Sequence, residues 1–277
     1  MGISVNTNVG AAVALQSLNA TSKQLNTVQS RVSTGQKVAT AKDDGAVWAV
    51  ANKMKSDVSA YDKVSESADR ASAMLDTATA AGSAISDLLN QMKSTAVAAT
   101  QTGLSASAQA NYDAQFKQLR DQITSIINNA SFDGSNMIGA TPASAVSLGD
   151  AAGTAANNIT IAGADLSLGG AVVTVTATSN VSTAALAGTA LGLINTSIDN
   201  LNKQLATWGA GSARLDNHKT FVGKLQDALN SGISSLTDAD LTKESAKLTA
   251  LQTKQQLGVQ ALSIANQSSQ IALSLFR

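Results

Sequence analysis

The chain has 277 residues and a mass of 28.0 kDa, with 19 basic residues, 19 acidic residues, one His and no Cys. This balanced charge lacks the basic excess on which nucleic-acid binding depends. The absence of Cys excludes disulfides, thiolate nucleophiles and zinc–cysteine sites, and a single His leaves little His-based catalysis or metal binding. The composition therefore argues against most classes of enzyme, while zero net charge lets copies of the chain pack closely.

Neither a membrane span nor a cleaved secretory signal is predicted. No stretch approaches eighteen consecutive apolar residues. The first residues, Met1–Val5, have neither the basic nor the apolar region of a signal peptide. We expect no membrane insertion, and export by a route that cleaves no signal remains open.

The N-terminal segment, residues 1–34, predicts a helix with apolar residues spaced by three and four. The pattern stops at Gly35, a residue typical of helix C-termini, and residues 35–43 are expected to form a linker. Asp43 and Asp44 are interpreted as capping charges of the next helix rather than as a catalytic pair. The apolar stripe consists of Ala11, Ala14, Leu18, Thr21, Leu25, Val28 and Val32.

Residues 44–130 predict a very long helix followed by a shorter one. Apolar positions recur every seven residues from Met54 to Ala96, with a second row offset by three, which is the pattern of a coiled coil. A helix from Asp44 to Thr100 would be about 80 Å long, so the molecule is predicted to be elongated. The shorter helix carries Tyr112, Phe116, Leu119, Ile123 and Ile126.

Residues 131–183 lose this helical periodicity and are rich in Gly, Ala, Ser, Thr and Asn. The single proline, Pro142, lies here. Short alternating runs separated by Gly-containing turns predict β-hairpins. The runs are Ala145–Leu148, Asn158–Ala162, Asp165–Leu168 and Ala171–Ala177.

Residues 184–233 predict a second long helix with its own seven-residue repeat. Trp208 lies in the apolar row and is expected in the core. The neighbouring row becomes polar at Ser212 and Lys219, which, with Gln255 further along the chain, are interpreted as residues that set the register of helix pairing. The apolar row consists of Ile194, Leu201, Trp208, Leu215, Val222, Leu229 and Leu236.

Residues 234–240 are expected to form a second linker, and residues 241–277 a last helix capped at Asp238 or Asp240. This helix is apolar on two sides, and a single partner helix covers only one of them. The terminal helices are therefore expected to order in an assembly. One stripe contains Leu248, Leu251, Val259, Leu262 and Leu273, and the other contains Leu257, Ala261, Ile264, Ile271 and Leu275.

The predicted fold class is mainly α: an elongated antiparallel bundle or coiled coil of long helices, with a small β-hairpin insert in the middle of the chain. No catalytic, cofactor or metal site is expected. A phosphate-binding loop is absent, and His218 is interpreted as a surface or packing residue. The insert contains only Asp133, Asp150 and Asp165 as titratable groups, so a non-enzymatic protein is predicted.

Three segments resemble bacterial flagellins. They are QSRVSTGQKVATAKDDGAVWAVANKM at Gln29–Met54, FDG at Phe132–Gly134 and QLGVQALSIANQSSQIALSLFR at Gln256–Arg277. The resemblance covers about residues 1–134 and 183–277, with both ends matching in order. It implies a structural subunit that self-polymerises into the flagellar filament, the propeller for swimming. It also implies type III export with an uncleaved signal, and assembly under a cap.

The resemblance further implies two domains. D0 would contain the terminal helices, and D1 the helices at 44–130 and 184–233 with the insert at 131–183. The expected D0 assembly interface consists of Leu18, Leu25, Val28, Val32, Leu251, Leu262, Ile271 and Leu275. The expected D1 core consists of Leu75, Leu89, Leu201, Trp208 and Leu215.

The implied partners are further copies of the chain, the flagellar cap, junction proteins and an export apparatus or chaperone. Flagellins sensed by the vertebrate receptor TLR5 carry a segment like LQRVRELA. Here Leu89–Ala96 reads LNQMKSTA, so the first Arg and the Glu are replaced, although Arg214 matches the family pattern. Weak or absent TLR5 activation is expected.

Other functions are also compatible with the sequence. A hook–filament junction protein would share flagellin-like ends, but the chain stops at Leu275-Phe276-Arg277, as flagellins do. An adhesive role of the Ser/Thr-rich insert, or its modification by O-linked sugar, is also compatible with the sequence.

Overall fold

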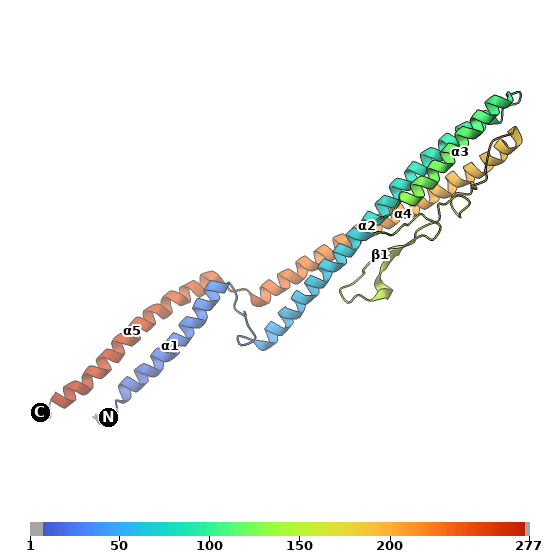
Figure 1. Ribbon diagram of the computed structural model, residues 1–277. Coiled ribbons are helices and arrows are strands. Elements are labelled where there is room, and N and C mark those ends of the chain that lie inside the picture. The colour runs from blue at the N-terminus through green and yellow to red at the C-terminus, as the bar shows by residue number, and fades with distance from the viewer. Residues whose placement is uncertain (1–7, 275–277) are drawn as a thin grey trace. The chain divides into compact units, whose positions relative to one another are not determined.

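The computed structural model describes residues 8–274, with side chains up to residue 267. Its elements in chain order are α1 (Val9–Thr34), α2 (Gly45–Ala99), α3 (Ala106–Asn129), β1 (Ala145–Ser147), the short 3-10 helix η1 (Ala155–Asn157), β2 (Ile159–Ile161), α4 (Ala184–Thr237) and α5 (Leu241–Ser274) (Figure 1). The predicted mainly α class with a small β insert is confirmed.

The chain forms two compact units. The first, here called the terminal unit, consists of Met1–Ser56 and Ala228–Arg277. The second, the central unit, is the continuous stretch Asp57–Asp227. The boundaries between the units fall within α2 and α4, so both long helices contribute to each unit.

The terminal unit is built on an antiparallel pair of helices, α1 and α5, which lie side by side (Figure 1). The side chain of Asn8 donates to the carbonyl of Ala265 at 2.7 Å at one end of the pair. Arg31 lies 3.7 Å from Glu244 at the other end. Because residues early in α1 meet residues late in α5, the two helices run in opposite directions.

Local signals define both ends of α1. The Asn8 side chain caps the helix by accepting from the N–H of Ala11 at 2.9 Å. Gly35 ends it with a left-handed backbone, φ 72°, and its N–H donates to the carbonyl of Arg31 at 2.9 Å. This conformation is strained for residues with a Cβ, so the Gly at which the apolar pattern stops has a structural reason.

Aspartates begin the helices α2 and α5. Asp44 caps α2 by accepting from two backbone N–H groups at 3.0 Å, as the sequence predicts. Asp240 likewise caps α5 by accepting from the N–H of Lys243 at 3.1 Å. Asp43 does not cap the helix: it stabilises the preceding turn by accepting from the N–H of Thr40 at 2.9 Å.

The two linkers pair with each other within the terminal unit. Gln36 and Asp238 form an isolated antiparallel bridge. The N–H of Lys37 donates to the carbonyl of Thr237 at 2.7 Å. The helix α4 continues to Thr237, so residues 234–237, expected in the second linker, are helical. No Gly or Pro interrupts the helix there, and the other linker satisfies its last carbonyl.

In the central unit, α2, α3, α4 and the insert share one hydrophobic core. Trp208 of α4 is fully buried, and its indole Nε1–H donates to the carbonyl of Ala162 in the insert at 3.1 Å. Buried aromatic N–H groups require such a partner. The largest fully buried side chains are Trp208, Phe116, Leu75, Ile85, Leu89, Met92, Ile123, Ile138, Leu166, Ile194, Leu201 and Leu215.

The insert contains less sheet than the sequence predicts. The strands β1 and β2 pair antiparallel, with Ala145 opposite Ile161. The expected strands at 165–168 and 171–177 are wrong: these residues form an irregular loop. The N–H of Gly169 is used within this loop, donating to the carbonyl of Val175 at 2.8 Å. The alternation instead reflects Leu166 and neighbouring valines that are buried in the core.

Candidate assembly surface

The structure brings together the α1 and α5 positions that the sequence assigns to an interface. Val28 is almost completely buried, and so is Thr21, about two helical turns earlier in α1. Gly258 of α5 permits a close approach, since a Cβ there would lie 3.3 Å from Leu18. The predicted residues Leu18, Leu25, Val32, Leu251 and Leu262 are half-buried. Ile271 lies where α5 has no described side chains, and Leu275 lies outside the described residues.

The outer faces of the same two helices carry large exposed apolar side chains. Each of these residues is 49–69% exposed. Leu257 and Ile264 belong to the second α5 stripe that the sequence indicates. Their counterparts on α1 were missed, although Val9 and Val13 have the spacing of one helical face. The exposed set is Val9, Val13, Leu15, Leu241, Leu257, Val259 and Ile264.

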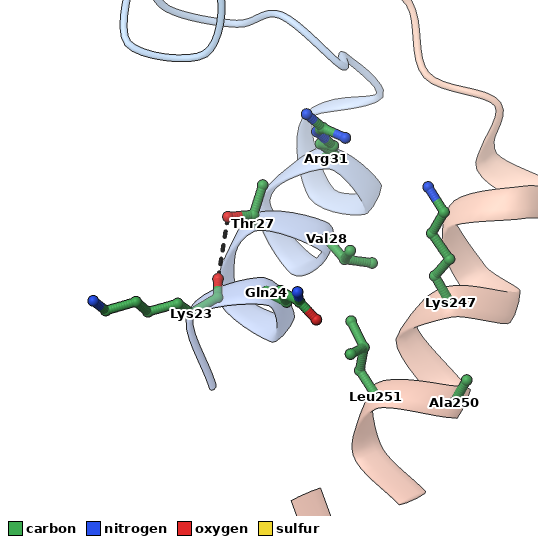
Figure 2. Close-up of a pocket in the computed structure, with 8 residues that line it drawn as sticks. All are labelled: Lys23, Gln24, Thr27, Val28, Arg31, Lys247, Ala250 and Leu251. Carbon is green, nitrogen blue, oxygen red and sulfur yellow. Dashed lines mark hydrogen bonds between the residues drawn. The ribbon is translucent and has the colours of Figure 1, made fainter. Parts of the chain in front are cut away.

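A groove of about 550 Å³ lies between α1 and α5. Figure 2 shows Val28 and Leu251 pointing into the space between the helices, with Arg31 and Lys247 near one end. The groove is therefore apolar at its base and basic at its edge. Its lining residues are Lys23, Gln24, Thr27, Val28, Arg31, Lys247, Ala250 and Leu251.

A buried carboxylate joins the two helices beside this groove. Glu244 is only 6% exposed, and its Oε1 lies 2.9 Å from Lys247 and 3.7 Å from Arg31. Its Oε2 and the Nε of Arg31 are buried without a hydrogen-bond partner. Sequence reasoning missed this cluster because Arg31 and Glu244 are separated by most of the chain, and no local pattern connects them.

The five residues expected to hold the D1 core all lie in the core of the central unit. Each of them is at most 1% exposed. These residues are Leu75, Leu89, Leu201, Trp208 and Leu215. Heptad spacing on α2 and α4 identifies such positions because residues seven apart lie on one helical face.

Polar residues interrupt the apolar contact between α2 and α4 within the central unit. Lys219 forms an ion pair with Asp69. Gln226 donates to Asp62 at 2.8 Å. Ser212 is half-buried, and Gln255 reaches Ser22 at 3.5 Å in the terminal unit. These contacts between helices are compatible with the prediction that polar residues set the register of helix pairing, which stays a prediction.

One buried acidic residue in the central unit has a clearly shifted pKa. Burial of Asp113 opposes its ionisation, but hydrogen bonds from Lys117 and from the backbone of Val181 outweigh that effect. The pKa of Asp113 is therefore lowered. The Oδ1 of Asp113 accepts from the N–H of Val181 at 2.9 Å, so its charge ties α3 to the segment that precedes α4.

Over residues 8–274, no group of three or more His, Cys, Asp or Glu side chains is placed to hold a metal ion. Among the helices of the described part of the chain, none is long and apolar enough to cross a membrane. The surface of the α1–α5 pair is distinguished by apolar residues on both the inner and the outer faces of the two helices.

Comparisons with known proteins agree with the resemblance found in the sequence. Residues 5–142 match the family model of the bacterial flagellin N-terminal helical region, and residues 191–276 match that of the C-terminal helical region. The chain is 48% identical to flagellin FljO of Caulobacter vibrioides over 99% of this chain and 98% of that protein. It is 36% identical to a flagellin of Brucella melitensis over 99% of both chains.

A solved structure, the crystal structure of Bacillus cereus flagellin, is also similar. Its TM-score is 0.48 at 26% identity, over 55% of this chain and 86% of that chain. The regions that match the two family models include the terminal helices α1 and α5. The chain belongs to the bacterial flagellin family and is a structural subunit of the flagellar filament.

Proposed function

We propose that copies of this chain polymerise through the outer apolar faces of α1 and α5. The observation that carries the proposal is the set of seven large apolar residues, Val9 to Ile264, that remain 49–69% exposed on a two-helix pair. Burying a Val, Leu or Ile side chain fully contributes about 1.5–3 kcal/mol. Contacts from several such residues per subunit therefore supply a strong drive for association.

Within this proposal, α1 and α5 form the D0 domain, and the helices of the central unit form D1. The apolar residues of the two helices then act at two levels. The predicted interface residues with described side chains, Leu18 through Leu262, hold α1 and α5 together, as Val28 does. The seven exposed residues, Val9 to Ile264, contact neighbouring subunits. A heterologous contact of this kind produces an open helical polymer when its rotation does not close.

The family relationship supports an extracellular location, because flagellar filaments extend from the cell surface. We propose export through the flagellar type III apparatus with an uncleaved N-terminal signal, and partners that include the cap, junction proteins and a chaperone. The chain would act as a structural protein without catalytic activity. The relatives named above are flagellins, and no observation here favours a hook–filament junction protein.

Weak activation of TLR5 is a separate part of the proposal. In the segment Leu89–Ala96, the residues exposed on α2 include Asn90, Lys93 and Ser94, whereas Leu89 is buried. The charged Arg and Glu of the recognised segment are thus missing from this surface. A reporter-cell assay should give a response far below that of a flagellin carrying LQRVRELA. Full activation at ordinary doses would contradict the expectation.

Polymerisation is tested by electron microscopy of the purified chain after addition of ammonium sulfate or filament seeds. The full chain should form long filaments, whereas a chain lacking Val259–Arg277 should remain monomeric. A full chain that stays soluble with seeds would overturn self-assembly and favour a junction protein.

Point variants make this test more specific. Val13→Ser and Ile264→Ser remove apolar surface from the outer faces and should raise the critical concentration for polymerisation. Leu186→Ser is the matched control, because Leu186 is also exposed but lies in the central unit. Equal critical concentrations for the three variants would argue against the outer faces as the interface.

A further inference from the structure

The methionine side chains of this chain differ in how far the fold shields their sulfur atoms. Three of the four methionines with described side chains are buried in the central unit: Met74 is 8% exposed, Met137 2% and Met92 0%. Met54, in the terminal unit, is partly exposed. Since the chain contains no Cys, an oxidant that reacts with sulfur attacks only methionine. Among the described residues, Met54 is therefore the sulfur that such an oxidant reaches most easily.

The end of the Met54 side chain lies in a notch that a glycine of α4 provides. A Cβ placed on Gly232 would lie 2.7 Å from the Cε of Met54, which is closer than two such carbons approach. The missing side chain at position 232 therefore leaves the room that the methyl group of Met54 occupies. Glycine lowers helix propensity in the interior of a helix such as α4, so this close approach gives Gly232 a reason in packing.

Few other side chains hold α2 and α4 together within the terminal unit. Among residues 45–56 of α2, only Ala51 is buried. Among residues 228–237 of α4, only Ile233 and Thr237 are buried. Short helix pairs with so little buried surface are marginally stable, and they depend strongly on each apolar contact. The contact between Met54 and Gly232 is thus a large part of what joins the two helices here.

This contact lies close to both linkers of the terminal unit. Gly232 is less than two helical turns before the end of α4 at Thr237. The first linker is bonded to the same end of α4, because the Nζ of Lys37 donates to the carbonyl of Ser235 at 3.1 Å and its N–H to that of Thr237. A change in how α2 meets α4 would therefore act on the backbone to which this linker is bonded.

We propose that Met54 is a site of reversible oxidation, and that its sulfoxide loosens the contact between α2 and α4 beside the linkers. The oxidant is hydrogen peroxide from the surroundings. A lone pair of the Met54 sulfur attacks one peroxide oxygen, the O–O bond breaks, an S–O bond forms, and the second oxygen leaves as water with both protons. The sulfur loses two electrons, and the peroxide gains them.

The sulfoxide of Met54 does not fit the notch at Gly232. The notch is too small for a Cβ beside the methyl group, so it has no room for an added oxygen. The backbone N–H groups around Gly232 already donate within α4, and a polar oxygen buried without a donor costs free energy. The oxidised side chain therefore leaves the notch, and the helices lose their contact there. Methionine sulfoxide reductases reverse the reaction.

Peroxide treatment of the soluble full-length chain, followed by peptide mapping with mass spectrometry, tests the site. The peptide that contains Met54 should gain one oxygen first. Met74, Met92 and Met137 should react at least about ten-fold more slowly, because they become accessible only when the core of the central unit opens. Equal rates for the four residues would overturn the assignment.

A glycine variant tests the notch without changing the methionine. Gly232→Ala places a Cβ against the flexible end of the Met54 side chain and should displace it toward solvent, so Met54 should be oxidised faster. Gly223→Ala is the matched control, because it replaces another glycine of α4 at which a Cβ would meet no atom within 4 Å. It should leave the oxidation rate of Met54 unchanged. Equal rates in the two variants would contradict shielding by the notch.

Amide hydrogen exchange measures the structural effect of oxidation. In the oxidised chain, exchange should accelerate about ten-fold in residues 45–56 and 228–237 and stay unchanged in α3. Treatment with methionine sulfoxide reductases A and B should restore the original rates. Met54→Leu is the control, because it keeps the apolar volume without the reactive sulfur. Acceleration by peroxide in Met54→Leu, or none in the oxidised original chain, would overturn the proposal.

Discussion

The terminal and central units are both built from long helices, but their apolar residues are distributed differently. In the central unit, three helices and the insert enclose a core in which Trp208, Leu201 and Leu89 have no exposed surface. In the terminal unit, the only buried residues among the described side chains of α1 and α5 are Thr21, Val28 and Glu244, while Val9 and other large apolar residues remain exposed.

This difference follows from the number of partners that each helix has. A helix in a pair buries one face, whereas a helix packed against two other helices and a covering loop buries a larger part of its circumference. The central unit can therefore satisfy its apolar residues within one chain. The terminal unit leaves apolar residues exposed that a second molecule would cover, which agrees with the assembly proposed above.

The largest expected effect is in the central core. Trp208→Ala should reduce the free energy of unfolding of the central unit by about 3–5 kcal/mol, because it leaves a cavity and an unpaired carbonyl at Ala162. Phe221→Ala on the same helix is the control, since Phe221 is 59% exposed and its loss should cost at most about 0.5 kcal/mol. Denaturant unfolding monitored by circular dichroism measures both. Similar losses for the two variants would contradict a closed central core.

A smaller effect is expected from the charged cluster of the terminal unit. Glu244→Gln removes the charge that holds Arg31 and Lys247 and should weaken the α1–α5 pair by about 2 kcal/mol. Amide hydrogen exchange in the soluble monomer should then accelerate about thirty-fold in α1 and α5 and remain unchanged in α3. Lys254→Gln, on an exposed part of α5, should leave exchange as it was. Uniform acceleration in both units would show that they are not independent.

The lowered pKa of Asp113 predicts a pH dependence confined to the central unit. The stabilisation is present above the ordinary aspartate pKa of 3.8 and is lost as the pH falls through the lower folded-state value. Asp113→Asn should cost about 1.5 kcal/mol at neutral pH, because it weakens bonds to Lys117 and Val181. Unfolding curves of variant and original chain should converge in acid. A constant difference at every pH would mean that the charge is not responsible.

The smallest expected effect is at the end of α1. Gly35→Ala should destabilise the α1 C-terminus by about 1 kcal/mol, because the left-handed backbone is unfavourable with a Cβ. No atom lies within 4 Å of that Cβ, so steric contact adds nothing. We expect a changed filament waveform, seen by microscopy, because this joint connects α1 to α2. An unchanged waveform would show that the backbone conformation at Gly35 does not influence how subunits pack in the filament.

Features that depend on neighbouring residues could be predicted from the sequence. Heptad spacing identified the buried residues Leu75 and Leu215, because one face of a helix is set by its own periodicity. Asp44 and Asp240 were recognisable as caps, since a cap needs only a side-chain oxygen just before the helix. The second apolar stripe of α5 indicated that one partner helix was insufficient, and Ile264 is indeed 67% exposed.

Features that depend on distant residues were decided by the tertiary structure. Trp48, a large aromatic residue near the start of α2, is 38% exposed. Residues 171–177 alternate like a strand yet form a loop, because a strand exists only where another strand offers hydrogen bonds, as β2 does for β1. The Arg31–Glu244 contact and the groove beside it depend on which residues of α5 face α1. Periodicity gives the face of a helix that is buried, but only the folded chain determines what that face meets.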